Sequence, residues 1–116
     1  MDNLKRDNYI KKLVSNSRAI LTNQIGLPLG VQKMTKILAW IENINSLENI
    51  DIEIFSKCYK EISKYPIGTE RLTYNKDFLK AQDRLIDDVV FKYKDLLVEK
   101  CHEIIEKYGP KISDNN

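Results

Sequence analysis

The chain has a single histidine, and its spacing from nearby carboxylates is the first pattern that could do chemistry. Glu99 precedes His102 by three residues, the Glu-x-x-His spacing of di-iron bundles, and residues 102–106 read HExxE. Di-iron sites use two copies of the first motif, and HExxE lacks the second imidazole with which HExxH binds zinc. At about 100° per residue, His102 also falls on the polar side of a helix, away from an apolar stripe between Leu96 and Ile104. The pattern therefore predicts a solvent-exposed histidine, no metal site and no cofactor.

Nucleophilic catalysis is not indicated either. Cys58 and Cys101 belong to no CxxC pair, and His102 would have to reach one of them, or a serine, through folding alone. Gly26 and Gly30 flank a proline turn and do not form a phosphate-binding loop. Because active sites usually need several convergent titratable groups, we expect that the protein is not an enzyme.

Four carboxylates of the C-terminal segment share one side of a helix. At helical geometry, Asp88, Asp95, Glu99 and Glu106 fall within about 40° of one another, and mainly Lys92 interrupts them. Two interpretations are open. The strip is either a solvated helix face or a docking strip for a basic partner, since complementary potentials raise association rates and select the partner.

Aromatic residues supply a second set of candidate contacts. Tyr65, Arg71 and Tyr74 gather around the loop at residues 66–68, which predicts either a contact surface or a loop packed onto the domain by its own tyrosines. Trp40 lies within an apolar helix pattern, which favours a place in the core. If Trp40 is exposed instead, it is the residue type most typical of an interface anchor.

Four helices are expected to position these residues, because apolar side chains recur at steps of three and four. Gly26 suits a left-handed C-cap and Pro28 prevents continuation, so the first helix ends here. Asp51 and Asn75 suit the N-caps of the third and fourth helices, although residues 50–54 also fit a short strand. The expected helices cover about residues 2–24, 29–44, 51–62 and 76–108, with a loop over 65–71.

The last helix is the longest. At 1.5 Å per residue it spans roughly 50 Å, more than the width of a four-helix domain of this size. We therefore expect its end to pair with another copy or another protein. Its predicted inner stripe is Phe78, Leu79, Leu85, Ile86, Val89, Val90, Tyr93, Leu96, Leu97, Cys101, Ile104, Ile105 and Tyr108.

Composition indicates the fold class and the domain organisation. With 116 residues, 42% hydrophobic side chains, four glycines and three prolines, the chain predicts one all-α domain over residues 1–110 and a frayed tail over 111–116. No apolar run is long enough to cross a membrane, and the N-terminus is not typical of a secretory signal. These features predict a cytoplasmic protein in which Cys58 and Cys101 are reduced thiols.

The charge of the chain argues against a nucleic-acid partner. The formal net charge is only +2, whereas nucleic-acid binders usually concentrate basic residues on one face. The basic residues near the N-terminus form no single stripe, because Arg6 and Lys11 diverge by about 140° on a helix. The full set considered is Lys5, Arg6, Lys11, Lys12 and Arg18.

Two stretches resemble a family. Arg18-Ala19-Ile20-Leu21-Thr22-Asn23-Gln24-Ile25-Gly26-Leu27, with the helix up to Trp40-Ile41, is similar to the N-terminal part of a small bacterial helical family, a domain of unknown function. Tyr65-Pro66-Ile67-Gly68, Arg71 and Tyr74, followed by the long helix with Asp83 and Cys101, resembles its C-terminal half. The similarity covers about residues 10–109 and implies a helical fold without an assigned reaction.

In size and style the chain also resembles toxin-neutralising immunity proteins of interbacterial competition. The expectation is an all-α four-helix bundle that acts as a non-enzymatic, cytosolic immunity protein and occludes a toxin domain. The alternative is a structural or regulatory bundle that self-associates, as a homodimer through its last helix. The expected partner-binding residues are Asp88, Asp95, Glu99, Glu106, Tyr65, Arg71 and Tyr74.

Overall fold

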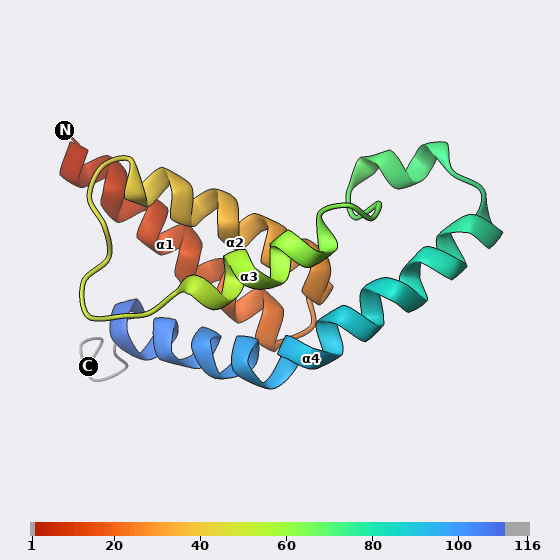
Figure 1. Ribbon diagram of the computed structural model, residues 1–116. Helices are drawn as coiled ribbons and strands as arrows, with labels where there is room; N and C mark the ends of the chain where they lie inside the picture. Colours follow the sequence, from red (N-terminus) through yellow and green to blue (C-terminus); the bar gives the residue numbers. More distant parts are fainter. Residues whose placement is uncertain (1, 111–116) are drawn as a thin grey trace.

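The computed structural model describes residues 2–110 (Figure 1). Four α-helices and one short 3-10 helix account for most of this range, which contains no strand. The predicted all-α fold with a long C-terminal helix is therefore confirmed, whereas the predicted frayed tail, 111–116, lies outside the described residues. The helices are α1 (Asp2–Leu21), α2 (Leu27–Glu42), α3 (Glu53–Ile62), η1 (Thr69–Thr73) and α4 (Lys76–Tyr108).

The four α-helices pack as a ring around one core. α1 lies against α2 and α4, and α3 closes the ring by packing against the same two helices. Each helix contributes fully buried apolar side chains, and their removal from water is the main stabilising contribution to the fold. The largest of these side chains are Phe55, Leu13, Met34, Ile41, Ile62, Leu97 and Ile104.

The turn between α1 and α2 differs in detail from its prediction. α1 ends at Leu21, before the expected Gln24, and the left-handed residue is Asn23 (φ 59°) rather than Gly26, which is extended at φ −63° and ψ 149°. Asparagine tolerates the left-handed conformation well, so it reverses the chain. Pro28 then lies in the first turn of α2, where its missing N–H costs nothing.

The segment before α4 is more ordered than expected. Residues 65–71 were predicted as a loop, but η1 forms there through local hydrogen bonds that periodicity does not reveal. The Arg71 backbone N–H donates to the Gly68 carbonyl over 3.1 Å, and the Ile67 N–H donates to the Glu70 carboxylate over 3.1 Å. Side-chain bonds of this kind give the backbone an alternative to a longer helix.

The predicted helix caps have different outcomes. Asn75 caps α4 as expected, because its Oδ1 accepts the Phe78 N–H over 2.8 Å. Asp51 also accepts a backbone N–H, that of Glu53 over 3.0 Å, but Ile52 is the residue at the cap position. The alternative strand over residues 50–54 does not form.

α4 extends along most of the described structure, whose longest dimension is 50 Å (Figure 1). Its N-terminal half and η1 together project beyond the ends of α1 and α2, and we call this part, residues 66–90, the arm. The prediction of one continuous inner stripe is wrong for Phe78, Leu85 and Leu96, which are 40%, 45% and 54% exposed. Apolar periodicity identifies a helix face, but only neighbouring helices determine how much of it is covered.

Candidate functional site

The arm is held together by an ion pair that sequence spacing did not predict. Arg71 of η1 donates from Nη1 and Nη2 to the two carboxylate oxygens of Asp83, over 2.7 and 2.9 Å, and Nη1 also donates to the Pro66 carbonyl over 3.1 Å. The hydrogen bond from Arg71 lowers the pKa of Asp83, and the same bond raises the pKa of Arg71. The guanidinium is thus engaged within the chain, where it orders the arm.

The two candidate tyrosines have different surroundings. Tyr65 is half-buried against the core, and the Lys64 ammonium lies 5.4 Å from its ring centroid. Tyr74 is 47% exposed at the end of η1, with its ring centroid 4.8 Å from that of Phe78. Arg71 bonds the Pro66 carbonyl, next to Tyr65 in the chain, and its own carbonyl accepts the Tyr74 N–H over 3.2 Å.

The four predicted carboxylates are all exposed along α4. At helical geometry they lie roughly 160–180° from the buried Leu97, so they face away from the core. Lys92, expected to interrupt them, is instead bonded to Glu61 of α3, with Nζ–Oε1 at 2.8 Å. Among the described residues, no cation forms an ion pair with the strip, whose members are Asp88, Asp95, Glu99 and Glu106.

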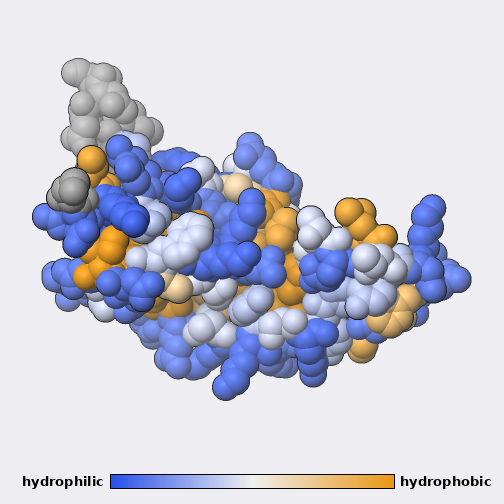
Figure 2. All heavy atoms as spheres, turned by 90° about the horizontal axis from the view of Figure 1, so that it is seen from above, coloured by the Kyte–Doolittle hydropathy of each residue, from blue (hydrophilic) through white to orange (hydrophobic). Residues whose placement is uncertain are grey.

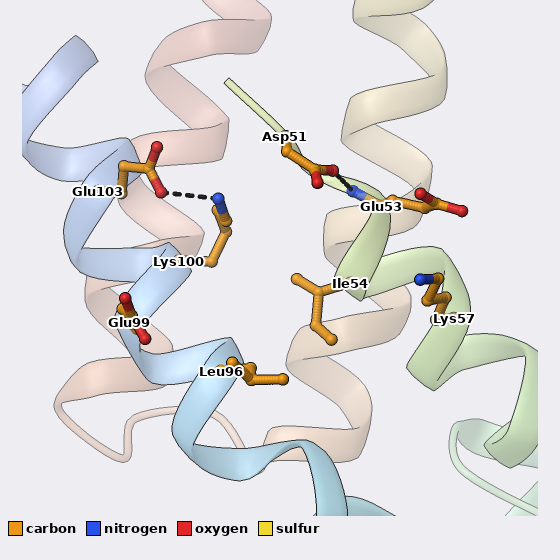
Figure 3. A pocket seen from close by; sticks show the side chains of 8 residues that line it. All are labelled: Asp51, Glu53, Ile54, Lys57, Leu96, Glu99, Lys100 and Glu103. Carbon is orange, nitrogen blue, oxygen red and sulfur yellow. Dashed lines mark hydrogen bonds and ion pairs between the residues drawn. The ribbon is translucent and has the colours of Figure 1, made fainter. Parts of the chain in front are cut away.

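A cleft of about 250 Å³ opens between the start of α3 and α4, beside the acidic strip (Figure 3). Ile54 and Leu96 point toward each other across its floor, while Glu99 lies at its α4 edge. Lys100 bonds the neighbouring Glu103 over 2.7 Å. The cleft therefore offers an apolar floor with charged edges, and the remaining lining residues are Asp51, Glu53 and Lys57.

An apolar stripe runs beside the acidic strip on α4. Phe78, Leu85 and Leu96 lie within about 20° of one another at helical geometry, and all three are substantially exposed. Figure 2 shows hydrophobic side chains at the surface of the projecting end of the molecule, on the right of the view. We call these three residues the apolar stripe.

The sequence patterns did not identify two strongly exposed apolar residues as surface residues. Leu72 is 87% exposed in η1, and Phe91 is 82% exposed on α4. Phe91 carried a usable signal, since it is not part of the predicted inner stripe and lies about 120° from Leu97, on the side opposite Leu85. Leu72 carried none, because η1 is too short for periodicity to be informative.

Trp40 is not in the core. Its side chain is 43% exposed and tilted against Tyr9 of α1, with ring centroids 5.3 Å apart. The core interpretation of Trp40 is therefore wrong. The neighbouring α2 residues Ile37 and Ile41 supply the buried face instead.

Thiol chemistry is disfavoured by burial. Cys58 and Cys101 are free and fully buried. Burial raises the pKa of each thiol to about 11; the nearby Glu61 carboxylate adds to this effect at Cys58, and a hydrogen bond with Ser17 opposes it at Cys101. A buried, protonated thiol is a poor nucleophile.

Titratable groups also join α3 to α4. Glu61 accepts hydrogen bonds from Lys92 and from the Tyr93 hydroxyl, and these lower the pKa of Glu61. The bond to Glu61 raises the pKa of Tyr93. His102 is exposed, as predicted, and within residues 2–110 no three potential metal-ligating side chains cluster together.

None of the helices that the structure describes combines the length and the apolar character needed to cross a bilayer.

Comparison of the chain with known protein families, with curated proteins and with solved structures finds no match.

Proposed function

We propose that this protein is a non-enzymatic protein-binding module that engages a basic partner domain through the outer face of α4. The observation that carries the proposal is the apolar stripe beside an acidic strip that forms no ion pair within the described chain. Apolar side chains supply the buried contact area of an interface, and the adjacent carboxylates supply charge complementarity.

The ion pair within the arm supports the same proposal. Arg71 and Asp83 join η1 to α4 in the absence of any partner. A surface ordered in advance loses less conformational entropy on binding than a flexible loop. Leu72 and Tyr74 at the end of the arm add exposed apolar area to the surface.

The more specific proposal is a cytoplasmic immunity protein that binds a toxin domain and occludes its active surface. Small size and the free thiols Cys58 and Cys101 support it, since free cysteines are typical of reducing compartments. A basic toxin surface, such as the nucleic-acid-binding face of a nuclease, matches the charge of the strip.

The alternative is self-association through α4. The exposure of Phe78, Leu85 and Leu96 favours it, because the same stripe on two copies can form an isologous interface. The acidic strip opposes it, since two copies would bring like charges near one another. A dimer whose dissociation depends on concentration, and which Leu85→Glu abolishes, would favour this alternative.

The test begins with a tagged pull-down from the native cells, followed by mass spectrometry of stoichiometric partners. Affinity for the recovered partner is then measured for the double variant Asp95→Lys with Glu99→Lys, and for Leu85→Glu. We expect each to weaken binding by roughly tenfold or more, and the effect of charge reversal to shrink at high salt.

The matched control reverses two exposed carboxylates outside α4, Asp7→Lys with Glu48→Lys, and so makes the same change in net charge. It should bind the partner almost as well as the wild type. Equal affinities for all variants would overturn the surface assignment. If co-expression with the partner does not relieve any toxicity, the immunity role fails while the binding module stands.

A further inference from the structure

A second groove, of opposite charge, lies between α1 and α2. Its volume is about 710 Å³, and it is separate from the α4 surface, because its lining residues come only from α1, the following turn and α2. The two helices approach closely at one end of it. Asn16 donates to the Gly30 carbonyl over 3.0 Å, and a Cβ at Gly30 would lie 2.6 Å from Cγ1 of Ile20.

All charged residues that line the groove are lysines. Lys12 extends from α1, while Lys33 and Lys36 come from successive turns of α2. All three are exposed, and none forms an ion pair with any residue that the structure describes. This uncompensated positive charge favours an acidic occupant.

Apolar side chains form the floor between the lysines. Ala19, Ile25, Leu29 and Ile37 line it, and the half-exposed Trp40 stands at one edge against Tyr9. A groove between two helices with an aliphatic floor suits the apolar face of a third helix.

Single-stranded nucleic acid fits this lining less well. Nucleic-acid grooves rely on several stacking aromatic rings and on arginine, whereas this lining has one aromatic residue, Trp40, and no arginine. Lysine offers only a compact point charge, without a planar fork for phosphate. The aliphatic floor and the lysine edges together favour a peptide over bases.

We propose that the α1–α2 groove binds an acidic amphipathic helix of a partner protein, whose apolar side chains rest on the Ile25–Leu29–Ile37 floor and whose carboxylates meet Lys12, Lys33 and Lys36. The protein then has two interaction surfaces of opposite charge, an acidic one on α4 and a basic one on α1 and α2. This inference does not depend on the function proposed for α4.

The experiment uses Trp40 as an internal reporter, since it is the only tryptophan of the chain. The probe is a synthetic helical peptide without tryptophan, with leucines on one face and glutamates on the other, titrated into the full-length protein. We expect the emission of Trp40 to shift to the blue with saturation as its exposed ring is covered. Affinity should fall several-fold as salt rises, because the ion pairs are at the surface.

Charge reversal at Lys33→Glu with Lys36→Glu should weaken peptide binding by roughly tenfold or more. The matched control, Lys60→Glu with Lys64→Glu, makes the same net change on exposed lysines elsewhere and should retain binding. Lys33→Ser with Lys36→Ser tests the same point without added acids, and far-UV circular dichroism establishes that each variant is folded.

Three outcomes would overturn the proposal. One is an unchanged Trp40 emission with the acidic peptide. Another is equal binding of a peptide in which lysines replace the glutamates. The third is a single-stranded oligothymidylate that binds more tightly than the peptide and displaces it, which would assign the groove to nucleic acid. Failure of the α4 proposal would appear separately, in the Asp95 and Glu99 variants, without any effect on the Trp40 signal.

Discussion

Arg71 and Asp83 form a two-pronged ion pair that joins η1 to α4 across twelve residues of sequence, with N–O distances of 2.7 and 2.9 Å. Both side chains are partly exposed, at 32% and 44%, so solvent screens the pair. Its contribution to the free energy of unfolding is therefore expected to be at most about 1 kcal/mol. Its structural consequence is local, because it joins η1, which has no buried residue of its own, to α4.

The first prediction concerns this pair. Asp83→Ala should accelerate proteolytic cleavage within residues 66–75 while the thermal midpoint changes little. Limited proteolysis with mass spectrometry measures it, and Arg84→Ala, at the exposed neighbouring position, serves as the control. An unchanged cleavage rate at residues 66–75 would show that the arm is ordered by other contacts.

The same pair predicts an acid dependence of arm stability. Because the folded pKa of Asp83 is depressed, its contribution is complete above the unfolded pKa of about 3.9 and is lost as pH falls through the folded value. The cleavage rate should thus rise in acid for the wild type. In Asp83→Asn it should already be raised at neutral pH and depend less on pH.

The second prediction compares two phenylalanines. Phe55 is fully buried and Phe91 is 82% exposed. Phe55→Ala should lower the free energy of unfolding by about 3–5 kcal/mol, since it leaves a cavity in the core. Phe91→Ala should change it by less than about 0.5 kcal/mol. Urea denaturation followed by circular dichroism measures the free energy of unfolding of each variant. A loss of several kcal/mol for Phe91→Ala would contradict the exposed position of this side chain.

The third prediction concerns the two thiols. Burial raises the pKa of Cys58 and of Cys101 to about 11, so a disulfide reagent should react very slowly with the native protein near pH 8. Denaturant should release both thiols for rapid reaction. Because the folded pKa is raised, stability should also decline as pH rises from the unfolded thiol pKa of about 8.5 toward 11. Rapid native labelling of Cys58→Ser would identify Cys101 as accessible and contradict this assignment.

The fourth prediction concerns Glu61 and Tyr93. Glu61→Gln removes the negative acceptor that raises the pKa of Tyr93, so that pKa should fall toward its usual value near 10. A pH titration with carbon-13-labelled tyrosine, observed by NMR, measures the change. Glu99→Gln removes an exposed carboxylate that has no described bond to a tyrosine and should leave the titration unaltered. An equal shift in both variants would mean that general electrostatics, and not the hydrogen bond, sets this pKa.

Local signals predicted most of the fold. Asn75 caps α4 because its side chain reaches an N–H three residues along the chain, and such contacts depend on no distant partner. The Pro28 turn is another local feature, although the left-handed position fell on Asn23 instead of Gly26. The order and number of helices followed from apolar spacing for the same reason.

The candidate surfaces were only partly predictable. Spacing on a helix put Asp88, Asp95, Glu99 and Glu106 on one side, and the structure describes all four as exposed. Spacing could not predict the ion pair of Lys92 with Glu61 or that of Arg71 with Asp83, because each pair joins two different elements. Spacing did not predict the lysine groove for the same reason, since Lys12 and Lys36 line one groove only when α1 packs on α2.

What the sequence alone determined is thus the set of helices and the polarity of their faces, both products of contacts within a few residues. The tertiary structure decided which apolar residues are covered. Leu85 and Leu97 belong to the same predicted stripe, yet Leu97 is fully buried and Leu85 is 45% exposed. The physical reason is that burial depends on the elements packed against a face. Ile86, next to Leu85, is only 3% exposed, so α4 is covered at this level, and Leu85 is exposed because it lies about 120° from Leu97 around the helix.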